Sequence, residues 1–557
     1  MIPIFNKSLH LSQLKYILAL AFKKYKGLYV VYIANIISIM IEFLGISILG
    51  IISQQGVKIS IPFFDHIGEE ELFMLFVFLF LIRFISMFIL ESWITYYAKE
   101  LQVYLSSTAF TKVVYENIKD IEKVEIGHYV TLSGDEASNA SQILISMTGI
   151  VNGLLLILVY LVAVILFSSS MFFLLILLLM VIAFTVKLVY KKLFSLGHAQ
   201  AELRRTTSSM FLDAFNALRI VKSFSLESYM SNQYKHEVAK YFTVNSKLII
   251  YNYLTKYIPI VLLFVMFELY LVEGYLNGKT YDIAFLVTLL FMLMRLLQAI
   301  GNFAGLLGKL IAELRGIHNI VTFIQEFYIS SKKEKINEKI NDILIDDISL
   351  SYGDNKVFEN FSFSFMSGES YAIYGESGSG KSTLLDLIMD FTSPESGRVL
   401  INGINVQEIQ ENNLTKKVMY VGQESLVFNK SIRENIELDR TFSDDELLDV
   451  LKMVKLDEMV EQFSDGINYM LYYKGTNISG GQRQRINLAR ALIRKPDVLI
   501  LDEATSALDS ETKEYIVSRI LEEYKDKIII FVTHDTSILP LVSNVMDLKQ
   551  IKKNNEC

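Results

Sequence analysis

The chain has 557 residues, which is more than one ordinary domain holds. Hydrophobic residues make up 52% of the sequence and the mean hydropathy is +0.37, although 20% of the residues are charged, so part of the chain is expected in a membrane and part in water. The formal net charge of -7 gives no support for a nucleic-acid partner, and the single cysteine, Cys557, excludes an internal disulfide and a cysteine-rich metal site.

Six apolar stretches precede residue 310, and each reaches the roughly 20 residues that a helix needs to cross the hydrocarbon core of a bilayer. They run over 28–52, 71–96, 146–168, 170–190, 257–276 and 283–307. Buried helices of a soluble protein are the alternative, but six such stretches in a row, several almost without charge, favour membrane spans. The sequence therefore predicts a transmembrane domain of six helices over residues 1–325.

The positions of lysine and arginine predict the orientation of these spans. The N-terminal segment and the connection between the fourth and fifth spans are rich in both residues, whereas the connections after the third and fifth spans carry few. Both termini are therefore expected in the cytoplasm, together with the long polar segments 97–145 and 191–256. These segments are amphipathic and contain no proline, so they predict helices that extend far into the cytoplasm. The abundance of Lys, Ile and Asn suggests a bacterium, and thus a multi-pass protein of the bacterial plasma membrane.

Polar side chains inside the spans are costly and mark candidate functional positions. The first and sixth spans each place such residues at helical spacing on one face, and the second and fifth spans contribute one charge each. The candidates are Asn35, Glu42, Arg83, Glu268, Arg295, Gln298 and Asn302. Two interpretations stay open: the residues line a translocation cavity, or Glu42–Arg83 and Glu268–Arg295 are ion pairs that hold the bundle together.

A polar, charge-rich stretch predicts a linker over 326–342, followed by a second domain over 343–557. Alternating segments at 344–352 and 361–365 predict β-strands, and a short apolar strand at 371–374 leads into a glycine-rich loop. Strand, glycine loop and helix in this order are the context that a phosphate-binding loop requires.

The glycine-rich loop fits the phosphate-loop pattern of spaced glycines followed by lysine and a hydroxyl residue. Its candidate nucleotide-binding residues are Gly375, Glu376, Ser377, Gly378, Ser379, Gly380, Lys381, Ser382 and Thr383. The glycines let backbone N–H groups approach phosphates at the start of a helix, and Lys381 neutralises the outer phosphates. The hydroxyl of Ser382 is placed to bind Mg²⁺.

A second apolar strand at 498–501 ends in two carboxylates. Asp502 suits the coordination shell of Mg²⁺. Glu503, the next residue, is the candidate general base that orients and deprotonates the attacking water.

The order of these motifs, with Asn477-Ile-Ser-Gly-Gly-Gln482 between them and Ser506-Ala-Leu-Asp509 and His534 after them, resembles the nucleotide-binding domain of an ATP-binding cassette (ABC) protein. The long inner segments, with turns expected near 115–123 and 209–219, resemble the exporter class of that family. The implied fold is a membrane α-helical bundle of six transmembrane helices with long cytoplasmic extensions, followed by an α/β P-loop NTPase domain of ABC type.

The resemblance implies further roles. Tyr352 matches the aromatic residue that stacks on adenine, Gln423 the glutamine that senses the γ-phosphate and the metal, and His534 the histidine that contacts the γ-phosphate. The resemblance also implies that one short segment completes the ATP site of a second copy, so that a homodimer holds two ATP molecules. Its residues are Ser479, Gly480, Gly481 and Gln482. The implied metal ligands are Ser382, Gln423 and Asp502.

The predicted function is ATP-driven export of a substrate across the bacterial plasma membrane by alternating access. A small peptide or an amphipathic molecule is the favoured cargo. The alternatives are a flippase for lipid or lipid-linked oligosaccharide, a multidrug exporter, and an ATP-gated channel or regulator on the same scaffold. The expected partners are a second copy of the chain, membrane lipid and the transported substrate.

Overall fold

The computed structural model of the chain describes residues 7–52, 68–116, 118, 121, 124–167, 171–278, 283–325, 334–353, 355–376 and 378–548. These residues form two compact units, a helical one that ends with Gln325 and a mixed α/β one that begins at Glu334. Each unit is described by itself.

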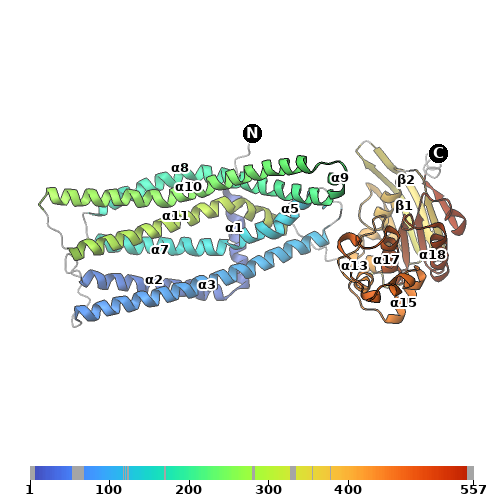
Figure 1. The fold of residues 1–557 in the computed structure, drawn as a ribbon, viewed down its shortest axis with the longest axis horizontal. Helices are drawn as coiled ribbons and strands as arrows, with labels where there is room; N and C mark the ends of the chain where they lie inside the picture. The colour runs from blue at the N-terminus through green and yellow to red at the C-terminus, as the bar shows by residue number, and fades with distance from the viewer. Residues whose placement is uncertain are drawn as a thin grey trace. The chain divides into compact units, whose positions relative to one another are not determined.

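The helical unit consists of long helices together with a few short ones (Figure 1). In chain order they are α1 (Lys7–Lys24), α2 (Gly27–Ile52), α3 (Glu69–Tyr115), α5 (Ile126–Thr131), α6 (Ala137–Ser141), α7 (Ile143–Phe167), α8 (Met171–Asn216), α9 (Leu218–Ser223), α10 (Glu227–Leu276) and α11 (Ile283–Gln325). A π-helical turn, Leu132–Glu136, joins α5 to α6. At about 1.5 Å per residue, the 47 residues of α3 span about 70 Å, so this helix extends well beyond a hydrocarbon core of about 30 Å.

Four helical segments of the described part are long and apolar enough to cross a membrane: Gly27–Ile48, Glu70–Tyr115, Ile126–Ile165 and Leu286–Ile311. They overlap the first, second, third and sixth predicted spans. The predicted span 170–190 falls in α8 except for residue 170, and most of its side chains lie outside the described part. The predicted span 257–276 falls in α10. The turn expected near 209–219 falls at Ala217, between α8 and α9, and the turn expected near 115–123 lies largely outside the described residues.

Neighbouring helices pack in pairs, with α2 beside α3, α7 beside α11 and α8 beside α10 (Figure 1). The helix faces turned away from the bundle carry large apolar side chains; on α3, Met74 is 64% exposed and Phe88 is 72% exposed. Such a surface is unfavourable in water and favourable against lipid tails. The exposed apolar faces therefore agree with a membrane-spanning bundle.

The second unit is built on two sheets. Its strands are β1 (Asp342–Tyr352), β2 (Asn355–Met366), β3 (Ser370–Tyr374), β4 (Ser396–Ile401), β5 (Ile404–Asn405), β6 (Val418–Val421), β7 (Val498–Asp502), β8 (Ile528–Val532) and β9 (Asn544–Asp547). Its α-helices are α12 (Lys381–Ile388), α13 (Glu411–Lys417), α14 (Ile432–Glu437), α15 (Asp444–Met453), α16 (Asp457–Glu461), α17 (Gly480–Leu492) and α18 (Ser510–Glu523).

One sheet is antiparallel, in the order β2-β1-β4-β5, and the other is parallel, in the order β6-β7-β8-β3-β9. Every residue of β7 and β8 is buried, which explains their continuous apolar sequences. Because β3, β7 and β8 run parallel and adjacent, the segments after their carboxyl ends meet at one edge of the sheet. That edge carries the phosphate loop, Glu503 and His534.

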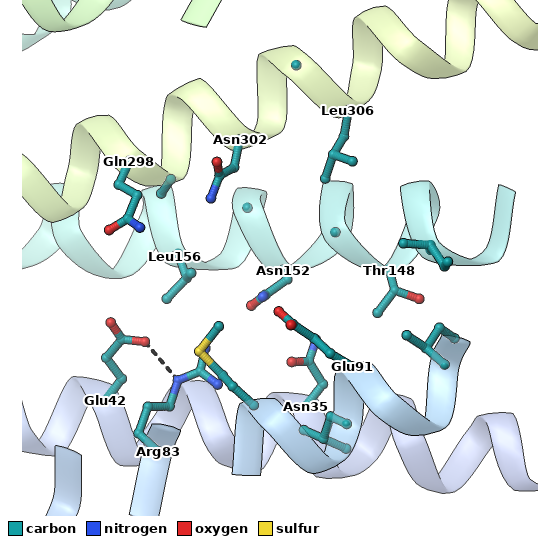
Figure 2. Close-up of a pocket in the computed structure, with 18 of the residues that line it drawn as sticks. Asn35, Glu42, Arg83, Glu91, Thr148, Asn152, Leu156, Gln298, Asn302 and Leu306 are labelled. Carbon is teal, nitrogen blue, oxygen red and sulfur yellow. Dashed lines mark hydrogen bonds and ion pairs between the residues drawn. The ribbon is translucent and has the colours of Figure 1, made fainter. Parts of the chain in front are cut away.

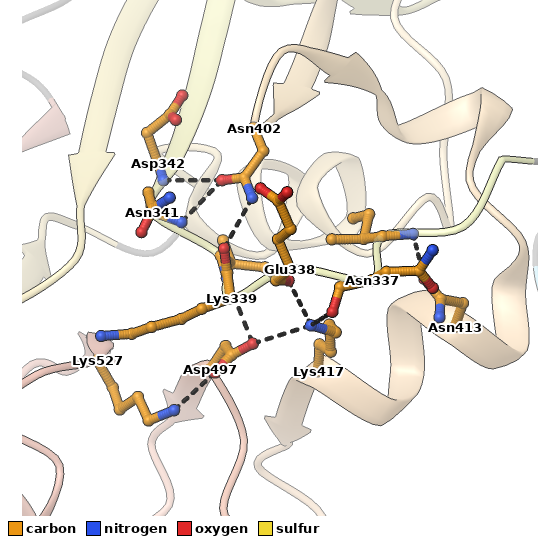
Figure 3. Close-up of polar contacts among 12 residues, drawn as sticks. Asn337, Glu338, Lys339, Asn341, Asp342, Asn402, Asn413, Lys417, Asp497 and Lys527 are labelled. Atoms are coloured by element: carbon orange, nitrogen blue, oxygen red, sulfur yellow. Dashed lines mark hydrogen bonds and ion pairs between the residues drawn. The ribbon is translucent and has the colours of Figure 1, made fainter.

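The segment before β1, which the sequence predicts as part of a linker, packs within the second unit (Figure 3). Ile336 and Ile340 are buried in the core beside the antiparallel sheet. The backbone N–H of Ile336 donates to Asn413 Oδ1 at 2.6 Å, and that of Ile340 donates to Asp497 Oδ2 at 3.3 Å. Residues 326–333 of the predicted linker lie outside the described residues.

Candidate functional site

The loop between β3 and α12 has the backbone of a phosphate cradle. Gly378 and Gly380 have φ angles of +80° and +101°, a left-handed region that strongly favours glycine. The Nζ of Lys381 folds back onto this loop and donates to the carbonyl oxygens of Gly375 at 2.8 Å and Glu376 at 2.9 Å. Ser377 lies outside the described residues. An incoming phosphate would therefore compete with these two carbonyl oxygens for the ammonium group of Lys381.

Gln423 and His534 meet at the carboxylate of Glu503. Gln423 Nε2 donates to Glu503 Oε2 at 2.8 Å, and His534 Nε2 lies 3.4 Å from Glu503 Oε1. These three residues follow β6, β7 and β8, which are adjacent in the parallel sheet. The structure thus brings together the three residues that sequence reasoning assigned to catalysis.

Asp502 is the last residue of β7 and has a different environment. It is 8% exposed, and Tyr420 in β6 donates its hydroxyl to Asp502 Oδ2 at 2.9 Å. Burial raises the pKa of Asp502; the Tyr420 hydrogen bond opposes this shift and the charge of Glu503 adds to it. Burial also lowers the pKa of Lys381, against the attraction of the Glu503 and Asp502 carboxylates. Burial removes water from both charged groups. A nearby cation would therefore stabilise the ionised form of Asp502, and a nearby anion would stabilise the ionised form of Lys381.

Ser479 is the N-cap of α17. Its Oγ accepts from the backbone N–H of Gln482 at 3.2 Å, and the side chain of Gln482 accepts from the N–H of Ser479 at 2.8 Å, which forms a capping box. Ser479 and Gly480 are exposed, so the positive end of this 13-residue helix faces outward. Gly481 lies against the segment after Glu503, where an added Cβ would come within 3.1 Å of the carbonyl oxygen of Ala507.

Tyr352 ends β1 and is 46% exposed, and its role in adenine binding stays a prediction. Sequence reasoning missed Tyr420, which hydrogen-bonds Asp502, and Gln484, which contacts the backbone of Glu503. The position of Gln484, two residues after the Ser479–Gln482 segment, was the available signal. Tyr420 gave no signal in the sequence beyond being a strand tyrosine.

A cavity of about 570 Å³ lies between α2, α3, α7 and α11 of the helical unit (Figure 2). Gln298 and Asn302 project into it from α11, and Asn152 projects from α7. The lining includes the predicted residues Asn35, Glu42, Arg83, Arg295, Gln298 and Asn302. Thr148, Asn152 and Glu91 also line it and were missed, although a polar residue inside the third span, such as Asn152, was a detectable signal.

Glu42 is the hub of a buried polar cluster at one end of this cavity. Arg83 Nε donates to Glu42 Oε2 at 2.9 Å, and the hydroxyl of Tyr160 donates to Glu42 Oε1 at 2.5 Å. Arg83 Nη1 also donates to Ser38 Oγ at 2.7 Å, and the Arg83 side chain is 1% exposed. These hydrogen bonds join α2, α3 and α7 at Glu42, which also lines the cavity.

One predicted ion pair is wrong. The sequence suggested Glu268–Arg295, but Arg295 Nη2 lies 3.9 Å from Glu42 Oε1, while Glu268 is exposed on α10 and is not among the residues that line the cavity. The physical reason is the direction in which the side chains point. Arg295 faces α2 across the bundle, and the face of α10 that carries Glu268 turns away from it.

Comparisons with known proteins follow this geometry. Residues 28–300 match the family model described as ABC transporter transmembrane region, and residues 358–506 match the model described as ABC transporter. A "Putative export ATP-binding/permease protein" of Rickettsia bellii is 25% identical over 96% of this chain and 94% of its own length. The heterocyst differentiation ATP-binding protein HepA of a Nostoc species is 30% identical over 65% of this chain and 60% of its own length.

Two further relatives are informative. An ATP-dependent lipid A-core flippase of Francisella tularensis is 36% identical over 40% of this chain and 40% of its own length. The solved structure of a bacterial Atm1-family ABC exporter with ATP bound has a TM-score of 0.79 at 18% identity and covers 94% of both chains. The similarity to this solved structure shows that the chain has the same fold.

The chain therefore belongs to the ABC transporters. It is a multi-pass membrane protein of the exporter type that carries a transmembrane region and an ATP-binding domain in one polypeptide, the arrangement of a half-transporter. Its ATP-binding domain is an ATPase coupled to transport. The family and fold class expected from the motifs are confirmed.

Proposed function

We propose that two copies of the chain form a homodimer in the bacterial plasma membrane and export short peptides, with both termini in the cytoplasm. The single observation that carries this proposal is the carboxamide-lined cavity of the helical unit, in a chain that also carries an ATPase. ATP binding brings the two nucleotide-binding domains together and turns the cavity outward, and hydrolysis resets it.

The residues at the sheet edge divide the work of hydrolysis. Lys381 and the loop N–H groups bind the phosphates, and Tyr352 stacks on adenine. Glu503 accepts a proton from the attacking water, while Gln423 and His534 orient its carboxylate and contact the γ-phosphate. Ser479–Gln482 of each copy, of which Ser479 and Gly480 are exposed at the start of α17, close the ATP site of the other copy.

The residues present fit Mg²⁺. Asp502 offers a desolvated carboxylate and Ser382 an exposed hydroxyl, and hard oxygen ligands are the kind that Mg²⁺ prefers. Gln423 offers an amide oxygen once its amide group turns from Glu503. When bound with ATP, the ion would neutralise charge on the phosphates.

The chemistry of the cavity favours peptide over lipid. Side-chain amides both donate and accept hydrogen bonds, as peptide groups do, and Asn152 Oδ1 is buried without a hydrogen-bond partner among the described residues. An acyl chain in this space would leave such groups unpaired, at a cost of about 1–3 kcal/mol each. The apolar walls, such as Leu156 and Leu306, accommodate apolar side chains of the cargo.

The charges at the cavity also disfavour a phosphate-bearing headgroup. Glu42 already engages Arg83 and Arg295, and Glu91 adds a second negative charge to the lining. A doubly charged phosphate would therefore meet two carboxylates. The Arg83 guanidinium is already paired with Glu42, although its Nη2 is buried without a hydrogen-bond partner among the described residues.

The test is the ATPase rate of the purified protein in nanodiscs, measured with panels of short peptides, lipid-linked oligosaccharide and cationic dyes. We expect peptides alone to stimulate hydrolysis. Asn302→Ala and Asn152→Ala should each raise the half-maximal peptide concentration about tenfold, the effect of losing about 1.4 kcal/mol of hydrogen bonding. Glu268→Gln, a membrane carboxylate outside the cavity, is the matched control and should change nothing. Stimulation by glycolipid or dye without stimulation by peptide would reject the peptide assignment.

A further inference from the structure

Gln484 lies on the first turns of α17 and is 2% exposed. Its Nε2 donates to the backbone carbonyl of Glu503 at 2.9 Å, and its Oε1 accepts from the backbone N–H of Ala507 at 2.9 Å. Both polar atoms of the side chain are therefore committed to the segment that carries the candidate base. Gln484 does not contact the phosphate loop through these bonds, so its effect on hydrolysis acts through Glu503.

Gln484 bonds a backbone segment whose conformation is unfavourable for most residues. Glu503 has a φ angle of +50°, a conformation that residues with a Cβ rarely adopt and that persists only where the surroundings enforce it. Its N–H donates to the carbonyl oxygen of Val532 at 2.9 Å, and its carbonyl oxygen accepts from Ser506 N–H at 3.0 Å as well as from Gln484. Together these bonds orient the Glu503 carboxylate toward Gln423 and His534.

The same helix also reaches the segment that follows Gln423. At its C-terminal end, Arg490 Nε donates to the carbonyl oxygen of Asn435 at 2.8 Å, and Arg490 Nη1 donates to that of Leu426 at 3.1 Å. The helix α17 is thus bonded to the base through Gln484 and to the loop of the base's hydrogen-bond partner through Arg490. A shift of the helix cannot leave the geometry of Glu503 and Gln423 unchanged.

We propose that Gln484 is a positioning residue for ATP hydrolysis. Through Gln484, the orientation of the Glu503 carboxylate depends on the position of α17. This inference rests on the proposed function, in which Ser479 at the start of α17 contacts the ATP of the second copy. Gln484 then links the two ATP sites: a nucleotide at the start of the helix fixes the helix, and the helix fixes the base of its own chain.

The test is steady-state ATP hydrolysis by the full-length protein with Gln484→Met, which keeps the length of the side chain and removes its hydrogen bonds to Glu503, Ser506 and Ala507. We expect kcat to fall at least tenfold while KM for ATP stays within about twofold, because misplacing a catalytic group by about 1 Å costs up to ~10²-fold in rate. Gln462→Met makes the same chemical change at an exposed position and should hydrolyse ATP like the wild type.

Gln484→Glu separates the two bonds, because it keeps an acceptor for Ala507 N–H and loses the donor to Glu503. It should lose kcat as the methionine variant does, and it carries the test if the methionine variant fails to fold. In a Glu503→Gln background, Gln484→Met should cause no further loss of hydrolysis, since no base is left to position.

Several results would overturn the inference: wild-type kcat in Gln484→Glu, a raised KM with unchanged kcat, or losses that multiply in the double variant. A wild-type protein that hydrolyses no ATP would instead reject the proposed function. The two failures are therefore distinguishable.

Discussion

Glu503 combines a left-handed backbone with a carboxylate held by Gln423 and His534. Strain of this kind, about 1–3 kcal/mol per residue, persists where the surrounding contacts over-determine it. The neighbouring Asp502 is buried and bonded to Tyr420, so the two adjacent carboxylates have different environments. In the proposed function Glu503, which faces the histidine and the glutamine, accepts the proton.

At this scale the first prediction concerns Glu503→Gln. The variant should bind ATP with near wild-type affinity and lose at least ~10²-fold in hydrolysis, the usual effect of removing a general base. Measuring both binding and phosphate release on the same preparation checks it. Hydrolysis at the wild-type rate would show that another group acts as the base.

A second residue-scale prediction concerns Asp497, which anchors the segment before β1 (Figure 3). Its carboxylate contacts Lys527 Nζ at 2.6 Å and Lys417 Nζ at 3.4 Å. Burial alone would raise the pKa of Asp497, but the hydrogen bond and charge of Lys527, with help from Ile340 N–H and Lys417, lower it below the ordinary 3.8. The stabilisation is therefore present at neutral pH and is lost as the pH falls through the lowered pKa.

Asp497→Asn should destabilise the nucleotide-binding unit by about 2 kcal/mol at pH 7, which is a shift of about 4–8 °C in its melting temperature. The difference from the wild type should shrink as the pH is lowered below about 4. Asn341→Asp, an exposed change in the same segment, serves as the control. A melting temperature unchanged at pH 7, or a difference that does not depend on pH, would contradict this account.

Among the elements, the strands around the nucleotide site could be predicted closely because their signals are local. The predicted strand at 371–374 is β3 (Ser370–Tyr374), and the apolar run before Glu503 is β7 (Val498–Asp502). The helix α17 begins at Gly480, because Ser479 caps it through a local serine–glutamine pattern. These patterns depend on residues a few positions apart.

Contacts between elements could not be predicted in the same way. Tyr160 bonds Glu42 across 118 residues, and the choice of Glu42 over Glu268 as the partner of Arg295 depends on which helix faces meet. The segment before β1 is predicted as a linker because its polar residues outnumber Ile336 and Ile340. Those two residues are buried in a core cluster with residues far away in the sequence, such as Ile500, which a local pattern does not reveal.

The charged cluster between α2 and α3 gives the element-scale prediction. Removing one member of a buried pair strands the other in a low-dielectric interior, so Arg83→Gln should destabilise the helical unit by about 3–5 kcal/mol. The double variant Glu42→Gln, Arg83→Gln should recover much of this loss. Thermal unfolding in nanodiscs measures both. Equal stability of the wild type and Arg83→Gln would mean that the cluster does not hold the bundle together.

For the whole molecule, the exposed start of α17 predicts ATP sites shared between two copies. Lys381→Ala disables the phosphate loop and Ser479→Arg disables the opposing segment, so each variant alone should be inactive. Co-expressed, they should restore one composite site in the mixed dimer, and hydrolysis should return to a fraction of the wild-type rate. A mixed dimer without activity, or an active monomer, would contradict shared sites.

The measurement that tests the central claim most directly is transport itself. Inside-out proteoliposomes that contain the protein are given ATP and a short peptide that stimulates its ATPase, and the peptide inside the vesicles is quantified by mass spectrometry. The account predicts accumulation above the external concentration that requires ATP and is lost in Glu503→Gln. Accumulation without ATP, equilibration without a gradient, or ATP hydrolysis without any peptide uptake would contradict it.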